Sequence, residues 1–396
     1  MSSALEQRSL TVLHLGRVQR RPELDALRGL FLVWMTLTHL PTHMSDYVNQ
    51  PLGYISSAEG FVFLSGLLVA HLYVRMADEN EEQMKSKLWK RSLKIYGYHL
   101  FMLFFAFTIV AAIAARTHRP ALVNLLNFYL AHPVTAVIGS VLLIYCPPLL
   151  DILPMYVTYM IATPWLLILA KRWSWKPILW ASGGVWLLAQ FGLRRGIHSL
   201  VTATTGLHIP LQETGAFNLF AWQIVWVAGL WIGATSAHGA LPFQRLPRFV
   251  YGLSAAICAF FIAVRHNWLG HMNQQYFGMQ LDKWQIGPLR LLNLIAFSCL
   301  LYWGRHVVSK IVQVEPLLTL GKASLEVFCA HVFFVFSGLA FLYGEIDQLH
   351  GMHAVALVAF TFCGMLLVAL REARRTQQAK TSPSTSSTPN ASSSTR

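Results

Sequence analysis

The sequence predicts an all-α polytopic membrane protein with about ten transmembrane helices and no soluble domain. Of its 396 residues, 55% are hydrophobic and only 12% are charged, whereas about a quarter of the residues of a soluble domain are charged. The apolar residues gather in long runs, and the cations gather between these runs. The 13 Trp residues are typical of a chain that meets lipid headgroups. These observations exclude a soluble enzyme of two domains.

Ten apolar segments come close to or exceed the length of about 20 residues that a helix needs to cross hydrocarbon. They lie at about 25–44, 56–76, 92–115, 150–170, 176–193, 217–237, 248–265, 285–304, 318–343 and 351–370. The stretch 121–147 is also apolar, but Pro133, Gly139 and Pro147 interrupt it. We expect a re-entrant or interfacial hairpin there, with an eleventh span as the alternative.

The cations are distributed unequally between alternate loops. One set of segments is rich in them, including Arg17, Arg20, Arg21, Lys87, Lys90, Arg91, Lys171, Arg172, Arg374 and Arg375. The other set carries only Arg116, Arg119, Arg194, Arg195, Arg265 and Lys283. Because cytoplasmic loops carry the excess of Lys and Arg, both termini should be cytoplasmic. The predicted parts are a basic N-terminal segment (1–22), a transmembrane domain (23–372) and a disordered tail rich in Ser, Thr and Pro (373–396).

Two further classes of function are disfavoured by composition. The net charge of +14 is spread over loops and forms no single basic stripe, so no nucleic acid is expected as a partner. The five cysteines stand singly and mostly in apolar runs, so they predict buried small side chains and no metal site. No permanently bound cofactor is expected.

Ionisable residues inside an apolar span are costly, so they mark candidate functional positions. The first span carries Asp25, Arg28 and His39. Eleven residues separate the last two in number, which is three turns plus roughly 20°, so they share one helix face at depths about 16 Å apart. The alternatives are a snorkelling arginine and a hydrogen-bonded packing histidine.

Glu59 lies just inside the outer end of the second span, at the depth predicted for His39. We therefore expect a His39–Glu59 pair, in which the carboxylate orients the imidazole as a general base. The alternative for Glu59 is a water-exposed carboxylate at the outer interface.

Other polar residues fall at the two ends of the spans. Arg91 and Lys94 belong to a basic cluster that precedes the third span, and they predict either a phosphate clamp or a topological anchor. Near the outer ends of later spans lie Asp151, Gln223 and Arg290, with His331 less close to that end. Together the outer group predicts a polar cavity for a hydroxyl-rich acceptor.

Six blocks of sequence resemble the OpgC family, bacterial membrane proteins that succinylate osmoregulated periplasmic glucans. The first is RPELDALRGL at 21–30, followed by His39, Leu40 and Pro41; the others lie at 57–66, 151–156, 217–223, 288–293 and 321–331. The family is related to the acyltransferase type 3 superfamily, whose first span carries an Arg and a His spaced as Arg28 and His39 are. Two departures stand out: Thr38 replaces an Asp common in the family, and Gly60 follows Glu59.

The resemblance implies an O-acyltransferase in the bacterial inner (cytoplasmic) membrane. Its donor would be cytoplasmic acyl-coenzyme A, with succinyl-coenzyme A expected, and its acceptor a periplasmic glucan or related glycan. Donor binding then falls to Arg28, Arg91 and Lys94, catalysis to His39 and Glu59, and acceptor binding to Asp151, Tyr156, Gln223 and Arg290. Asp25, Ser65 and His331 are further candidates, Ser65 as an acyl carrier in a disfavoured mechanism. Membrane lipid is an expected partner, and the oligomeric state stays open.

Two rival functions fit a polytopic chain. A transporter or flippase for a glycan or lipid-linked substrate would also need a polar cavity, but should show inverted repeats and broken helices. A membrane cytochrome would need facing His ligands, for which His39, His99 and His331 are available.

Overall fold

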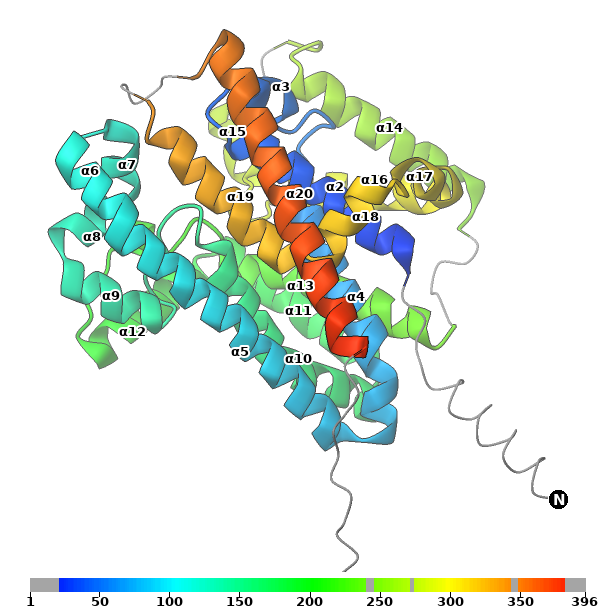
Figure 1. Ribbon diagram of the computed structural model, residues 1–396. Helices are drawn as coiled ribbons and strands as arrows, with labels where there is room; N and C mark the ends of the chain where they lie inside the picture. Colours follow the sequence, from blue (N-terminus) through cyan, green and yellow to red (C-terminus); the bar gives the residue numbers. More distant parts are fainter. Residues whose placement is uncertain (1–20, 240–245, 271–273, 343–347, 382–396) are drawn as a thin grey trace, which may run out of the picture.

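The structure is a computed structural model that describes residues 21–239, 246–270, 274–342 and 348–381 (Figure 1). Within these ranges the chain is helical, and its one extended pairing is a bridge between Thr42 and Leu349. The predicted all-α fold class is confirmed.

The first half of the described chain holds helices of very different lengths. Their bounds are α2 (Pro22–His39), α3 (Met44–Val48), α4 (Ser57–Glu79), α5 (Glu81–Phe105), η1 (Ala106–Val110), α6 (Ala111–Thr117), α7 (Pro120–Leu125), α8 (Asn127–Ala131), α9 (Pro133–Val141), α10 (Ile152–Trp173) and α11 (Trp175–Gln190). Helices α5, η1 and α6 run on as one, and η1 is a π-helical turn within it.

The second half continues in the same way. Its helices are α12 (Leu193–Thr205), η2 (Leu211–Glu213), α13 (Leu219–Ala237), α14 (Arg248–Arg265), α15 (Gln274–Leu281), α16 (Pro288–Trp303), α17 (Arg305–Val312), α18 (Glu315–Lys322), α19 (Ser324–Leu339) and α20 (Gly351–Thr381). Every one of the ten predicted spans overlaps one or more of these helices.

Fewer than ten helices are long and apolar enough to cross a membrane. Six helices meet both criteria: α4, the α5–α6 rod, α10, α13, α14 and α20. Two bent pairs, α16–α17 (81°) and α18–α19 (95°), raise the number to eight if each pair counts as one span. The first predicted span does not meet the criteria because α2 carries three charged residues, Glu23, Asp25 and Arg28. The fifth predicted span does not meet them because α11 has only 16 residues. The described chain therefore supports six to eight spans.

The local sequence explains where the first two helices begin and end. Pro22 occupies the first turn of α2, where its missing N–H costs nothing, and α2 ends at His39, two residues before Pro41. Helix α4 begins with a capping box, in which Ser56 and Glu59 each satisfy the other's backbone N–H.

The interrupted stretch 121–147 forms no single spanning helix. It is divided among α7, α8 and α9, and the first and last of these begin at a proline. The described helices therefore provide no eleventh span here, because the longest of the three has nine residues. In Figure 1 these helices gather with α12 at one end of the α5–α6 rod.

Glycines allow two pairs of helices to approach backbone to backbone. Between α4 and α13, a Cβ at Gly229 would meet the carbonyl oxygen of Phe63, and one at Gly233 would meet that of Leu67. Small residues four apart are a common device for close helix packing in membranes.

The second close approach joins α2 to α18. A Cβ at Gly321 would strike the carbonyl oxygen of Asp25, and one at Gly29 would strike that of Leu317. Since the chain turns by 95° immediately after α18, this contact delivers the first residue of α19, Ser324, to the first turns of α2.

Candidate active site

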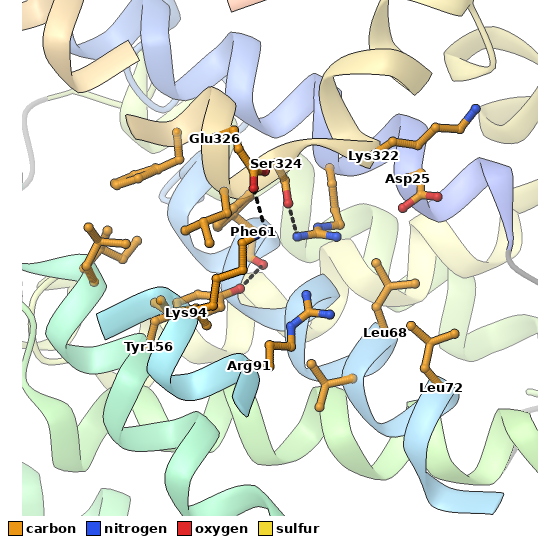
Figure 2. A pocket seen from close by; sticks show the side chains of 17 residues that line it. Asp25, Phe61, Leu68, Leu72, Arg91, Lys94, Tyr156, Lys322, Ser324 and Glu326 are labelled. Atoms are coloured by element: carbon orange, nitrogen blue, oxygen red, sulfur yellow. Dashed lines mark hydrogen bonds and ion pairs between the residues drawn. The ribbon is translucent and has the colours of Figure 1, made fainter. Parts of the chain in front are cut away.

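A cavity of about 220 Å³ lies among the first turns of α2, α10 and α19, the middle of α5 and one side of α4 (Figure 2). Both polar and apolar side chains line it. They are Asp25, Arg28, Phe61, Leu68, Val69, Leu72, Arg91, Lys94, Ile95, Ile152, Leu153, Tyr156, Lys322, Ser324, Leu325, Glu326 and Phe328.

The three predicted donor-binding cations line this one cavity. Arg28 is 8% exposed; its Nη2 donates to the Ser324 hydroxyl, and its guanidinium lies 5.8 Å from the centre of the Phe61 ring. Arg91 and Lys94 are three residues apart on α5, so they share a face of that helix. Figure 2 shows the Arg91 guanidinium directed into the space below Ser324.

The cavity carries more positive than negative charge. Its cationic lining residues are Arg28, Arg91, Lys94 and Lys322, and its acidic ones are Asp25 and Glu326. Lys94 Nζ is 2.8 Å from Glu326 Oε1, to which the Tyr98 hydroxyl also donates at 3.3 Å. The net positive charge suits an anionic ligand with several phosphate or carboxylate groups.

Three polar members of the cavity, Lys322, Ser324 and Glu326, were not assigned a role from sequence. They follow one another across the break between α18 and α19. In the sequence this break is hidden within a continuous apolar segment at 318–343. The available signal was the polar pattern Lys-x-Ser-x-Glu inside that segment.

An aromatic pair forms part of the cavity lining. The rings of Phe61 and Phe328 are stacked with centroids 6.5 Å apart, and both line the cavity. On the other side of Phe328 lies His331, whose ring is 4.8 Å away. Nδ1 of His39 lies 3.3 Å from Nε2 of His331.

The predicted His39–Glu59 pair is wrong, because each side chain has another partner. Glu59 is fully buried and accepts from Arg290 Nε at 2.6 Å, with Arg290 Nη2 at 2.5 Å, and it also caps α4 through Ser56. Equal depth in two spans does not fix the direction in which a side chain points. Glu59 points toward α16, and His39 points toward α19.

A second cation lies close to the Glu59–Arg290 pair. Burial lowers the pKa of the Lys283 ammonium, and the nearby Glu59 carboxylate opposes this shift. The ammonium also lies 4.7 Å from the centre of the Trp284 ring. From the sequence, Lys283 counted only as an outer-loop cation.

The four predicted acceptor residues do not meet. Asp151 Oδ2 accepts from the backbone N–H of Ala216, and Gln223 exchanges two hydrogen bonds with Ser182 on α11. Arg290 belongs to the buried ion pair. Among the residues described, only Tyr156 of the four lines the charged cavity, and there it joins the predicted donor residues.

The remaining candidates also receive places. Asp25 is 2% exposed and lines the cavity, whereas Ser65 is 3% exposed inside α4 and is not among the lining residues. Within the described ranges, no three His, Cys, Asp or Glu side chains are grouped to hold a metal ion.

Fold and site together define a multi-pass helical membrane protein with a positively charged cavity. A family model described as OpgC protein matches residues 20–377, so the chain belongs to the OpgC protein family. No curated protein and no solved structure matches the chain. Family membership indicates an acyltransferase that modifies glucans, while the relation to the acyltransferase type 3 superfamily stays a prediction.

Proposed function

We propose that the protein is an inner-membrane O-acyltransferase that moves an acyl group, succinyl by preference, from cytoplasmic acyl-coenzyme A to a hydroxyl of a periplasmic glucan. The observation that carries this proposal is the meeting of Arg28, Arg91 and Lys94 in one cavity with net positive charge. Coenzyme A carries several phosphate charges, and Arg and Lys bind phosphate oxygens well. Membership of the OpgC protein family supports the choice of a glucan as acceptor.

The donor enters from the side on which α2 and α5 begin. Its phosphates bind Arg28, Arg91 and Lys94, and its acyl-bearing arm extends along α2 past Phe61 and Phe328. His39 lies eleven residues beyond Arg28, a rise of about 16 Å along the helix. That distance suits an extended arm whose thioester reaches the imidazole.

His39 then acts as the general base. As the sugar oxygen attacks the thioester carbonyl, its proton passes to His39, and a new ester bond forms while the carbon–sulfur bond breaks. The leaving thiolate takes up the proton from His39 and departs as coenzyme A. No acyl-enzyme on Ser65 is required.

The test uses purified full-length protein in lipid vesicles, with radiolabelled succinyl-coenzyme A and glucan. Wild type should transfer label to glucan, and His39→Ala should lower kcat by at least about 100-fold, the usual scale for removing a general base. The variant should retain the wild-type melting temperature. Near-normal transfer by a folded His39→Ala variant would refute the assignment.

A glycan or lipid-linked transporter is the second candidate, because the bent pairs α16–α17 and α18–α19 resemble the discontinuous helices of transporters. These pairs are consecutive in the chain, whereas transporters place them at corresponding positions of two repeats. The same vesicles distinguish the two functions. Movement of unmodified glycan across the bilayer without acyl transfer would favour transport.

A further inference from the structure

His331 contacts a backbone carbonyl as well as His39. It lies on α19 and is 1% exposed, and its Nδ1 is 2.6 Å from the carbonyl oxygen of Phe328, one turn earlier. A carbonyl oxygen only accepts, so Nδ1 of His331 carries a proton and donates it to this bond.

The proton on Nδ1 also determines the protonation state of the second ring nitrogen of His331, Nε2. A neutral imidazole has one N–H, so Nε2 of His331 presents a lone pair. A charge on this buried ring would lack solvent, and two cationic imidazoles in contact would repel each other. The group that faces Nε2 is Nδ1 of His39, at 3.3 Å.

The arrangement of the two rings fits a hydrogen bond in their common plane. Their planes differ by 19°, and their centroids are 5.5 Å apart, well beyond the separation of the nitrogens. The rings therefore meet edge to edge. The N–N distance is at the long end for a hydrogen bond, as is common at catalytic sites before substrate binds.

We propose that His331 is the positioning residue of this site and that it fixes His39 in the tautomer protonated at Nδ1. Because His39 donates from Nδ1, its Nε2 keeps a lone pair and is the atom that accepts the sugar proton. When that proton arrives, the bond from His39 to His331 becomes charge-assisted and stabilises the imidazolium. This inference rests on the proposed function and replaces Glu59 in the role that orients the base.

Helix α19 carries the whole arrangement on one face. Ser324, Phe328 and His331 are spaced four and three residues apart, so they follow one another along the helix. Ser324 binds Arg28, Phe328 lines the cavity and accepts from His331, and His331 bonds His39. One rigid element thus links the anion-binding cavity to the base.

Three substitutions of His331 separate its two hydrogen bonds. Gln can place an acceptor where Nε2 lies, Asn can replace only the donor to Phe328, and Leu provides neither. We expect His331→Gln to keep at least about a tenth of wild-type kcat, and His331→Asn and His331→Leu to lose about 100-fold, the scale of lost partners of a catalytic histidine. KM for succinyl-coenzyme A should stay within about twofold for all three.

This pattern of kcat and KM among the three variants distinguishes a positioning role of His331 from a purely structural one. A purely structural role would lower the melting temperature and yield of the variants in parallel with kcat, without separating Gln from Asn. Equal activity of His331→Gln and His331→Asn in folded protein would overturn the proposal, as would a loss expressed mainly in KM.

A second measurement does not depend on activity. Solid-state ¹⁵N spectra of histidine-labelled protein, with the His39 signals assigned by their loss in His39→Gln, report which nitrogen carries the proton. We expect protonation at Nδ1 in wild type and in His331→Gln, and a change to Nε2 in His331→Leu. If the spectra showed wild-type His39 protonated at Nε2, the tautomer assignment would be overturned. If wild-type protein transferred no acyl group in the vesicle assay, the proposed function would be refuted while the tautomer assignment could still hold.

Discussion

At the scale of single residues, two of the buried charges in this bundle are paired with each other. Glu59 and Arg290 are both almost completely shielded from solvent, and they join the start of α4 to α16. A buried pair contributes little net stability, but loss of one partner leaves the other charge uncompensated. The pair therefore holds the first hairpin to the second half of the chain.

Glu59→Gln should lower stability, by about 3–5 kcal/mol if the site behaves like other buried pairs. The double variant Glu59→Leu/Arg290→Met should recover much of that loss, because neither member of the pair is left as an uncompensated buried charge. Thermal melting in detergent measures both effects. If Glu59→Gln melted like wild type but lost kcat, a direct catalytic role would replace the structural one.

Arg28→Ala should raise KM for succinyl-coenzyme A about tenfold or more and change kcat little, because the lost contact binds the donor in ground and transition states alike. Lys310→Ala, which removes an exposed cation outside the cavity, is the control and should leave KM unchanged. An effect of Arg28→Ala on the acceptor KM alone would contradict donor binding.

Residue spacing predicted some of these contacts and missed others for one physical reason. Depth along a helix follows from 1.5 Å per residue, and Arg28, Arg91 and Lys94, which the sequence grouped at one mouth of the spans, line one cavity. The rotation of one helix relative to another is set by packing, which the spacing within each helix does not contain. The partner of His39 was therefore misassigned.

At the scale of elements, glycines decide which helices touch. Gly229 and Gly233 press α13 onto the backbone of α4, the helix that carries Glu59 and Phe61. The sequence located both helices by their apolar length, but it did not show that they pair. The bends between α16 and α17 and between α18 and α19 were also missed, because a broken apolar run has the composition of an unbroken one.

Gly233→Val should lower the melting temperature by several degrees and reduce the yield of folded protein, since its side chain would meet the backbone of Leu67. Gly184→Val is the matched control, because it lies within α11 and its Cβ would meet no atom within 4 Å. Equal stability of the two variants would show that close α4–α13 packing is unnecessary.

At the scale of the whole molecule, the distribution of Lys and Arg predicts the orientation in the membrane. The fold class was predictable since apolar runs of bilayer length form helices. The number of spans was not, because α2 carries charges and α11 is short.

Reporter fusions test the orientation. Green fluorescent protein fused after residue 396 should fluoresce, and alkaline phosphatase at the same position should be inactive, because both termini are predicted to be cytoplasmic. Phosphatase fused after His118, beyond the end of α6, should be active. The reverse pattern would invert the proposed membrane orientation.

The placement of Ser324, Phe328 and His331 along α19 makes that helix a spacer between the charged cavity and His39. Arg28 binds the first residue of this helix, Ser324, so the charged cavity and the hydrogen bond to His39 are attached to the same element. The separation between the charged cavity and His39 is consequently set by the rise along one helix.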